Sequence, residues 1–394
     1  MLNCGAPPEE PGDAPSWFFN APEGQWFEVP ASNNAADVGA SQGTFQNFTG
    51  AGIDQVRKEL VTTCAGGHLI NWRNATYVLR LSQEVPEWVR LVDDTQVPDE
   101  NPTGNNGDAS YADGSPRAVH HYNAGPYPIG DTIWLPAMPA QYHSGPSGSQ
   151  VWGLDRSVLN NPPLSAANAP WTFYGRGIPS GTSGVTIEQA SSAYDADTGL
   201  IWVSTNWSTG PYPFWSIDTA DGSITRYPSW GGGQYPAPNT RGIDGLSFIY
   251  NGHWIIISPA ASTPAAHVFP LSDPRSGTSR RINQSNSPNW TNLRKAGAVY
   301  HAPTQRAYFK NGSSGTTITT LDLPDDPLRG TYTWGTISAG GGSVPNGVGD
   351  FTHFNVVHDM GNGRAALIYA GNHNSAAHMF KLPIVAGGQI GEQS

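Results

Sequence analysis

Short apolar runs alternate with stretches rich in glycine, proline, serine and asparagine along most of the 394-residue chain. Six segments share one layout, in which an apolar run is followed by a small-residue loop and a second apolar run. These segments are 62–81, 132–155, 200–218, 253–273, 306–323 and 365–383. Such short runs bounded by turn residues predict β-strands rather than helices.

Each segment is preceded by a further run that predicts a hairpin partner. Asp197-Thr198-Gly199 and Asn251-Gly252 are turn sequences that tolerate positive φ between two twisted strands. A fourth run is clearest around four aromatic residues, Trp88, Trp171, Tyr227 and Trp334. Four strands repeated every ~40–60 residues indicate the blades of a propeller. We therefore predict an all-β fold, a six-bladed β-propeller of four-stranded blades.

The last of the six units lacks a fourth run of its own. The stretch GQWFEVPAS at 24–32, near the other end of the chain, matches the missing strand. We expect 25–30 to pair with 376–382, so that an N-terminal strand closes the ring and removes its free sheet edges. This divides the chain into an N-terminal extension (1–24), the propeller (25–383) and a C-terminal tail (384–394).

The first unit carries a more specific pattern. Gly66-Gly67 ends its second run, Tyr77 lies on the third and Trp88 on the fourth. In this order the chain resembles a kelch-type β-propeller, similar to the central domain of galactose oxidase. The later units keep the hydrophobic layout but replace the glycine pair, for example with Thr205-Asn206. We interpret the glycines as a tight turn, and we expect Trp88, Trp171 and Trp334 to pack between blades.

Composition and charge argue against several classes of protein and of binding site. Charged residues make up only 13% of the chain and the net charge is −11, which disfavours a nucleic-acid partner. The absence of an apolar run of about 18 residues predicts no membrane span, and the first residues do not resemble a signal peptide. The two cysteines, Cys4 and Cys64, are too few for a cysteine-rich metal site, and either a disulfide or two thiols is compatible with the sequence.

The loops between second and third strands should all emerge on one face of the ring, around its axis. They contain aromatic, amide and imidazole side chains that suit a glycan or a protein partner, although ordinary polar loop residues have the same composition. The candidate binding residues are His68, Trp72, Arg73, Tyr142, His143, Asn206, Trp207, Asn372, His373 and Asn374.

The sequence does not assign a catalytic residue, a metal ligand or a cofactor. Neither cysteine lies in the tyrosine–cysteine arrangement that galactose-oxidase-like copper chemistry requires. His120 and His121 are adjacent, so on a strand they point to opposite faces and would not share an ion. The hypothesis of a catalytic carboxylate pair, as in glycosidases, stays open, because the sequence does not show which carboxylates lie close together in space.

Two functional hypotheses follow. The first is a non-enzymatic recognition or structural module, such as a bacteriophage tail or other virion component on an extracellular surface. Its partners would be other subunits of a larger assembly and a host-surface glycan. The second is a carbohydrate-active propeller enzyme, a glycoside hydrolase or polysaccharide lyase. A cluster of carboxylates in the central depression of the ring would favour the enzyme.

Overall fold

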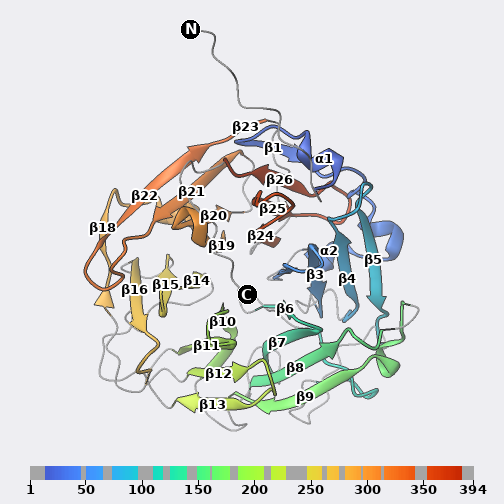
Figure 1. Cartoon of the computed structure of the whole chain (residues 1–394). Helices are drawn as coiled ribbons and strands as arrows, with labels where there is room; N and C mark the ends of the chain where they lie inside the picture. The colour runs from blue at the N-terminus through green and yellow to red at the C-terminus, as the bar shows by residue number, and fades with distance from the viewer. Residues whose placement is uncertain are drawn as a thin grey trace.

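We describe the protein from a computed structural model. The described residues are 14–45, 50–64, 73–95, 110–118, 125–139, 149–159, 162–177, 185–207, 214–227, 246–259, 264–274, 280–293, 296–311, 315–341 and 353–383. Their strands form six antiparallel sheets that surround a common axis, so the predicted six-bladed propeller is confirmed (Figure 1).

Each blade is built from four strands that follow one another from the axis outward. The first three blades are β2 (Gly52–Asp54), β3 (Glu59–Thr63), β4 (Thr76–Arg80) and β5 (Glu87–Val92); β6 (Tyr127–Ile129), β7 (Thr132–Pro139), β8 (Ser149–Asp155) and β9 (Trp171–Arg176); and β10 (Val185–Asp195), β11 (Leu200–Trp207), β12 (Phe214–Asp218) and β13 (Ile224–Tyr227).

The other three blades continue the same order. They are β14 (Leu246–Tyr250), β15 (His253–Ser258), β16 (Ala265–Pro270) and β17 (Arg280–Arg281); β19 (Ala296–His301), β20 (Arg306–Asn311), β21 (Thr317–Asp322) and β22 (Thr331–Ser338); and β24 (His353–Val357), β25 (Ala366–Ala370), β26 (His378–Lys381) and β1 (Gln25–Glu28). Two short strands, β18 (Asn283–Ser285) and β23 (Gly340–Gly341), add parallel to β22 and β1 at the outer edges.

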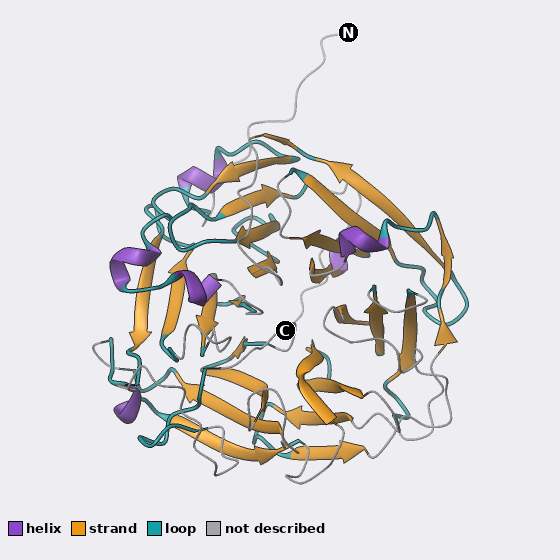
Figure 2. Cartoon of the chain, turned by 180° about the vertical axis from the view of Figure 1, so that it is seen from behind, coloured by secondary structure: helices purple, strands orange, loops and turns teal. Residues whose placement is uncertain are grey.

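Helical structure is sparse among the described residues, as Figure 2 shows. It consists of α1 (Ser16–Phe19), α2 (Gln42–Phe45), α3 (Trp290–Leu293) and the 3₁₀ turns η1 (Ala35–Val38), η2 (Ala166–Asn168) and η4 (Ala302–Thr304). None of these described helices has the length and apolar character needed to cross a bilayer.

The strand turns follow from the residues at their tips. Asn251 and Gly252 have φ of 46° and 65° between β14 and β15, as the asparagine–glycine sequence predicts. Gly199 has φ of 70° at the corresponding turn of the third blade. Antiparallel order places all such first-to-second-strand turns on one face of the ring, which we call the turn face. The second-to-third-strand loops lie on the opposite face, the loop face.

The N-terminal strand closes the ring as predicted. β1 pairs antiparallel with β26, with Trp26 opposite Phe380. Lys381, at the end of β26, is buried and its Nζ donates to the backbone oxygens of Phe18 and Phe19, at 3.4 and 2.9 Å. The chain entering β1 is therefore fixed to the last blade by main-chain and side-chain contacts.

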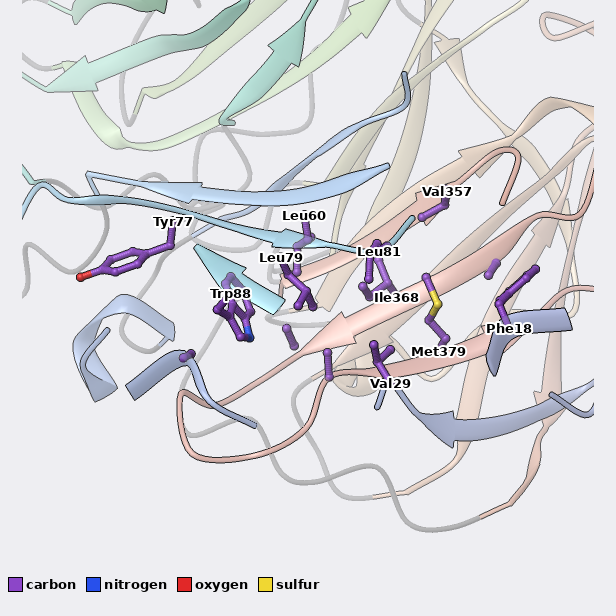
Figure 3. Packing of buried hydrophobic residues seen from close by; sticks show 14 of the residues in the cluster. Phe18, Val29, Leu60, Tyr77, Leu79, Leu81, Trp88, Val357, Ile368 and Met379 are labelled. Atoms are coloured by element: carbon purple, nitrogen blue, oxygen red, sulfur yellow. The ribbon is translucent and has the colours of Figure 1, made fainter. Parts of the chain in front are cut away.

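Hydrophobic clusters fill the seams between blades. Figure 3 shows the seam between the sixth and first blades, where Leu79, Ile368, Met379 and Phe18 pack in one cluster. Trp88 belongs to it with only 3% of its surface exposed, and its indole Nε1 donates to the backbone oxygen of Ser32. The segment before β1 thus contributes to the same core as the first and last blades.

The predicted burial of the outer-strand tryptophans is correct for two of the three. Trp334 is 3% exposed within the cluster shared by the fourth and fifth blades, and its Nε1 donates to Gln284 Oε1. Trp171 also packs between two blades, as predicted, but it is only partly buried. It begins β9, next to exposed residues such as Phe173, and packs at the margin of the seam between the first and second blades.

A buried ion-pair cluster joins the first and second blades on the turn face. Arg156, which follows β8, donates from Nη1 to Asp54 Oδ2 at 2.8 Å and from Nη2 to Glu59 Oε2. All three side chains are at most 8% exposed. Nearby, a Cβ added at Gly52 would lie 2.1 Å from the backbone oxygen of Pro126, so this seam also requires a glycine.

Candidate functional site

The first strands of the six blades lie around the axis of the ring (Figure 1). Their residues line a central channel with a volume of about 1230 Å³. Polar side chains form hydrogen bonds across several of the seams between neighbouring blades. Tyr127 on β6 lies 2.9 Å, hydroxyl to hydroxyl, from Ser192 on β10, and Ser247 on β14 donates to the backbone oxygen of Ser192 at 2.9 Å. Gln55 donates to the backbone oxygen of Val356 at 2.8 Å. These bonds join neighbouring inner strands and fix the shape of the channel wall.

Three aromatic rings meet in the seam between the fourth and fifth blades, where they pack with the hydrophobic cluster of that seam; the same three residues contribute to the lining of the channel. Tyr300, on β19, stacks on Phe248, on β14, with ring centroids 5.8 Å apart and an interplanar angle of 16°. Tyr250 meets Tyr300 edge to face at 5.4 Å and donates its hydroxyl to the backbone oxygen of Pro324. Tyr300 is half-buried, while Phe248 and Tyr250 are buried beside it. Burial raises the pKa of the Tyr300 phenol, which therefore stays protonated at neutral pH.

Two imidazoles lie on the wall at the next seam. His301 at the end of β19 and His358 after β24 stack with centroids 5.7 Å apart. Burial, followed by the neighbouring His358, lowers the pKa of His301 to about 4. Desolvation of its ring also lowers the pKa of His358. Both rings are therefore neutral at pH 7 and present nitrogen donors and acceptors without charge.

The described channel carboxylates belong to turns. Asp54 is buried and paired with Arg156. Asp195 accepts from the backbone N–H of Asp197 at 3.2 Å, and Asp359 accepts the N–H groups of its own turn, from residues 361 and 363. They lie on three different blades, so the described lining does not show a carboxylate cluster. The observation expected to favour an enzyme is not met within the described residues.

Four of the predicted loop-face residues are described with their side chains. Arg73 is exposed before β4, with Nη1 4.0 Å from Asp94 Oδ2. Asn372, His373 and Asn374 lie between β25 and β26, where Asn372 Oδ1 accepts the backbone N–H of Asn374 at 3.2 Å. Burial lowers the pKa of His373.

The other loop-face predictions are only partly located. Asn206 and Trp207 are the last residues of β11, paired with Thr186 and Val185, so they end a strand rather than form a loop. The remaining candidates lie outside the described residues; they are His68, Trp72, Tyr142 and His143. The Gly66-Gly67 pair, His120-His121 and Cys4 also lie outside the described residues. The loop face as a binding surface stays a prediction.

A buried polar network around Asn74 was not foreseen from the sequence. Asn74 Nδ2 lies 2.9–3.0 Å from Thr95 Oγ1, Ser115 Oγ and the backbone oxygen of Pro116, and its two protons are shared among these three acceptors. Asp113 in turn accepts from Thr95 and Ser115. Asn74 begins an Asn-x-Ser/Thr sequon, yet it is 1% exposed. Its amide therefore holds the connection that leaves the first blade and is shielded from glycosylation.

Cys64 is buried beside this network, and its Sγ lies 3.7 Å from the backbone oxygen of Asn74. Burial raises the pKa of its thiol to about 12, so the thiol is protonated at neutral pH. Within the described part of the chain, no group of three or more histidine, cysteine, aspartate or glutamate side chains has the arrangement of a metal site.

Lys310 is a buried cation between the fifth and sixth blades. It is 1% exposed, and its Nζ lies 5.5 Å from the centre of the Tyr369 ring. Burial lowers the pKa of Lys310 from 10.5 to about 8. Below pH 8 the folded protein therefore carries a buried charge that the unfolded chain exposes to water.

We expect Lys310→Met to raise the free energy of unfolding at pH 7 by up to about 3 kcal/mol, from about 1.4 kcal/mol per pKa unit. Between about pH 8 and 10.5 the unfolded wild-type chain binds the proton more tightly than the folded protein, so wild-type stability rises with pH. The variant should lack this rise. Urea unfolding across that pH range measures both effects, and parallel curves for the two proteins would contradict the assignment.

Comparisons with known proteins do not place the chain in a family. No family model matches it, and no curated protein matches it. Several solved structures have a similar overall shape. An α-L-arabinanase from Penicillium chrysogenum complexed with arabinobiose has 11% identity and a TM-score of 0.43, over 91% of this chain and 97% of that chain.

Two further solved structures are similar at the same level. An α-L-arabinofuranosidase from Fusarium graminearum has 10% identity and a TM-score of 0.46, over 91% of this chain and 97% of the other. The endosialidase of phage phi92 has 8% identity and a TM-score of 0.45, over 94% of this chain and 70% of the other. These values describe a likeness in shape, and the function has to be argued from this chain's own residues.

Proposed function

We propose that this protein is a carbohydrate-active β-propeller that binds a glycan in its central channel. The proposal follows the second of the two hypotheses raised by the sequence. The observation that carries it is half-buried Tyr300, a residue of the channel lining, whose ring is held against Phe248 and Tyr250 of the adjoining seam. The kelch-type assignment, the virion location and the subunit partners stay predictions.

The chemistry of the wall fits a sugar. A sugar ring has a flat face of C–H groups surrounded by hydroxyls, and an aromatic ring covers such a face while leaving the hydroxyls free to hydrogen-bond. The channel lining also includes the neutral imidazoles of His301 and His358, and Asn355, whose amide Nδ2 donates to the backbone oxygen of Ala51. These groups donate and accept hydrogen bonds without charge, as a polyhydroxylated ligand requires.

The dimensions of the channel suit more than one sugar unit. Sites for small molecules usually enclose about 300–1000 Å³ and place a few polar groups among apolar and aromatic walls. The channel volume of about 1230 Å³ exceeds that range. An oligosaccharide or a segment of a polysaccharide is therefore a better match than a single monosaccharide.

Binding is the part of the activity that the described residues support. Hydrolysis with a carboxylate pair requires two acidic groups roughly 5–10 Å apart on either side of the scissile bond. Asp54, Asp195 and Asp359 instead each accept hydrogen bonds within a turn of their own blade. We therefore assign the described wall to ligand binding and do not name a catalytic pair.

A polysaccharide panel tests the proposal. The full chain is incubated with plant, fungal and bacterial polysaccharides, and both retention on the polymer and release of oligosaccharides are measured. We expect retention on at least one polymer, and release from the same polymer would identify a hydrolase or a lyase. Failure to bind or cleave any member of the panel would contradict the proposal.

A further inference from the structure

The charged groups on the channel wall are strongly unbalanced. Of the described residues that line the channel, the acidic ones are Asp54, Asp195, Asp197 and Asp359, and the only basic one besides the two histidines is Arg364. Arg364 forms an ion pair with Glu23, and Asp54 pairs with arginines, so these two contribute little net charge to the channel.

Three carboxylates are left without a cationic partner among the described residues. Asp195 accepts from the Thr198 hydroxyl at 2.7 Å and from a backbone N–H group, while Asp359 accepts two backbone N–H groups. Asp197 is exposed beside Asp195. All of these hydrogen-bond partners are neutral, so none of them offsets the charge of a carboxylate.

The three carboxylates lie on the turn face at one end of the channel. Asp195 and Asp197 belong to the turn after β10, and Asp359 belongs to the turn after β24. Like charges that line the same channel reinforce one another, because the low-dielectric protein wall focuses their field into the channel. His301 and His358 do not offset this field, since their lowered pKa values keep both rings neutral at pH 7.

We propose that the channel selects neutral glycans and rejects acidic ones, such as polymers of uronic or sialic acid. This inference rests on the proposed function and specifies its substrate class. An acidic polymer would bring carboxylates toward Asp197 and Asp359, whereas Arg364, the arginine of the described lining, is already paired with Glu23. A neutral polymer reaches the aromatic wall at Tyr300 without that repulsion.

The test compares one polymer backbone in two charge states. A neutral polysaccharide that binds is oxidised at its primary hydroxyls to carboxylates, and dissociation constants for both forms are measured by calorimetry at low and at physiological ionic strength. We expect the oxidised form to bind about tenfold or more weakly at low ionic strength. Added salt should narrow the difference, because it screens exposed charges.

Paired variants locate the effect. Asp197→Asn combined with Asp359→Asn should reduce the difference between the dissociation constants of the neutral and the oxidised polymer. Asparagine keeps an oxygen that accepts the hydrogen bonds of the turn but removes the charge. Asp221→Asn is the matched control, because Asp221 is exposed on the β12–β13 turn and does not line the channel. It should leave the difference unchanged.

The outcomes separate this inference from the proposed function. Equal or tighter binding of the oxidised polymer would overturn the selectivity and leave glycan binding intact. A difference that persists in the double variant would also overturn it, because Asp197 and Asp359, the two exposed carboxylates, would not be its source. If neither form of any polymer binds, both the proposed function and this inference are wrong.

Discussion

Replacing Trp88 or Trp334 with alanine is expected to lower the free energy of unfolding by about 3–5 kcal/mol. Each indole is 3% exposed in a seam between two blades, so its removal leaves a cavity bounded by elements that cannot close together. Each substitution also leaves a former hydrogen-bond acceptor, the Ser32 oxygen or Gln284 Oε1, without its indole donor. Urea unfolding measures the change.

Phe173→Ala is the control for these two variants. Phe173 lies on an outer strand and is 47% exposed, so its loss should cost less than about 1 kcal/mol. An unchanged unfolding midpoint in both tryptophan variants would show that the blades do not pack through these outer strands.

Arg156→Ala is expected to cost about 3 kcal/mol, because Asp54 and Glu59 lose their buried cationic partner and keep only the more exposed Arg57 and Arg80. The two carboxylates come from the first blade and the arginine from the second, so the loss should weaken the seam between them. Thermal and urea unfolding of the variant at neutral pH check this expectation.

Two further variants separate the charge effect from packing. Arg306 pairs with Asp322 at a more exposed site, where the two side chains are 35% and 48% exposed, so Arg306→Ala should cost no more than about 1 kcal/mol. Adding Asp54→Asn and Glu59→Gln to Arg156→Ala should recover part of the lost stability. Equal losses for the two single arginine variants would rule out the buried cluster as the source.

The fold was predictable because its signal repeats. Six units with the same order of apolar runs fixed the number of blades, and the absence of a fourth run in the last unit located the partner strand at Trp26 and Phe27. Trp88 and Trp334 were identified because a large aromatic on an outer strand has to pack on the next blade. Trp171 packs between blades as well, although its place at the very start of β9 leaves it partly exposed.

The repeating pattern of apolar runs did not predict contacts between segments that are far apart in the sequence. β18 and β23 are two to three residues long and pair in parallel with strands far away in the chain, without an apolar pattern of their own. The contact between Phe248 and Tyr300 could not be predicted for the same reason, because the two residues come from different blades and meet only when the ring closes. The sequence drew attention to the second-to-third-strand loops, whereas the described aromatic cluster lies on first strands.

The most direct test of glycan binding in the channel compares Tyr300→Ala with Phe173→Ala. The measurement is the dissociation constant for the polysaccharide that the wild type binds most tightly, with thermal unfolding to verify that each variant is folded. We predict that Tyr300→Ala weakens binding at least about tenfold, that Tyr300→Phe retains most of it, and that Phe173→Ala binds like the wild type. Folded Tyr300→Ala protein with wild-type affinity would contradict the account.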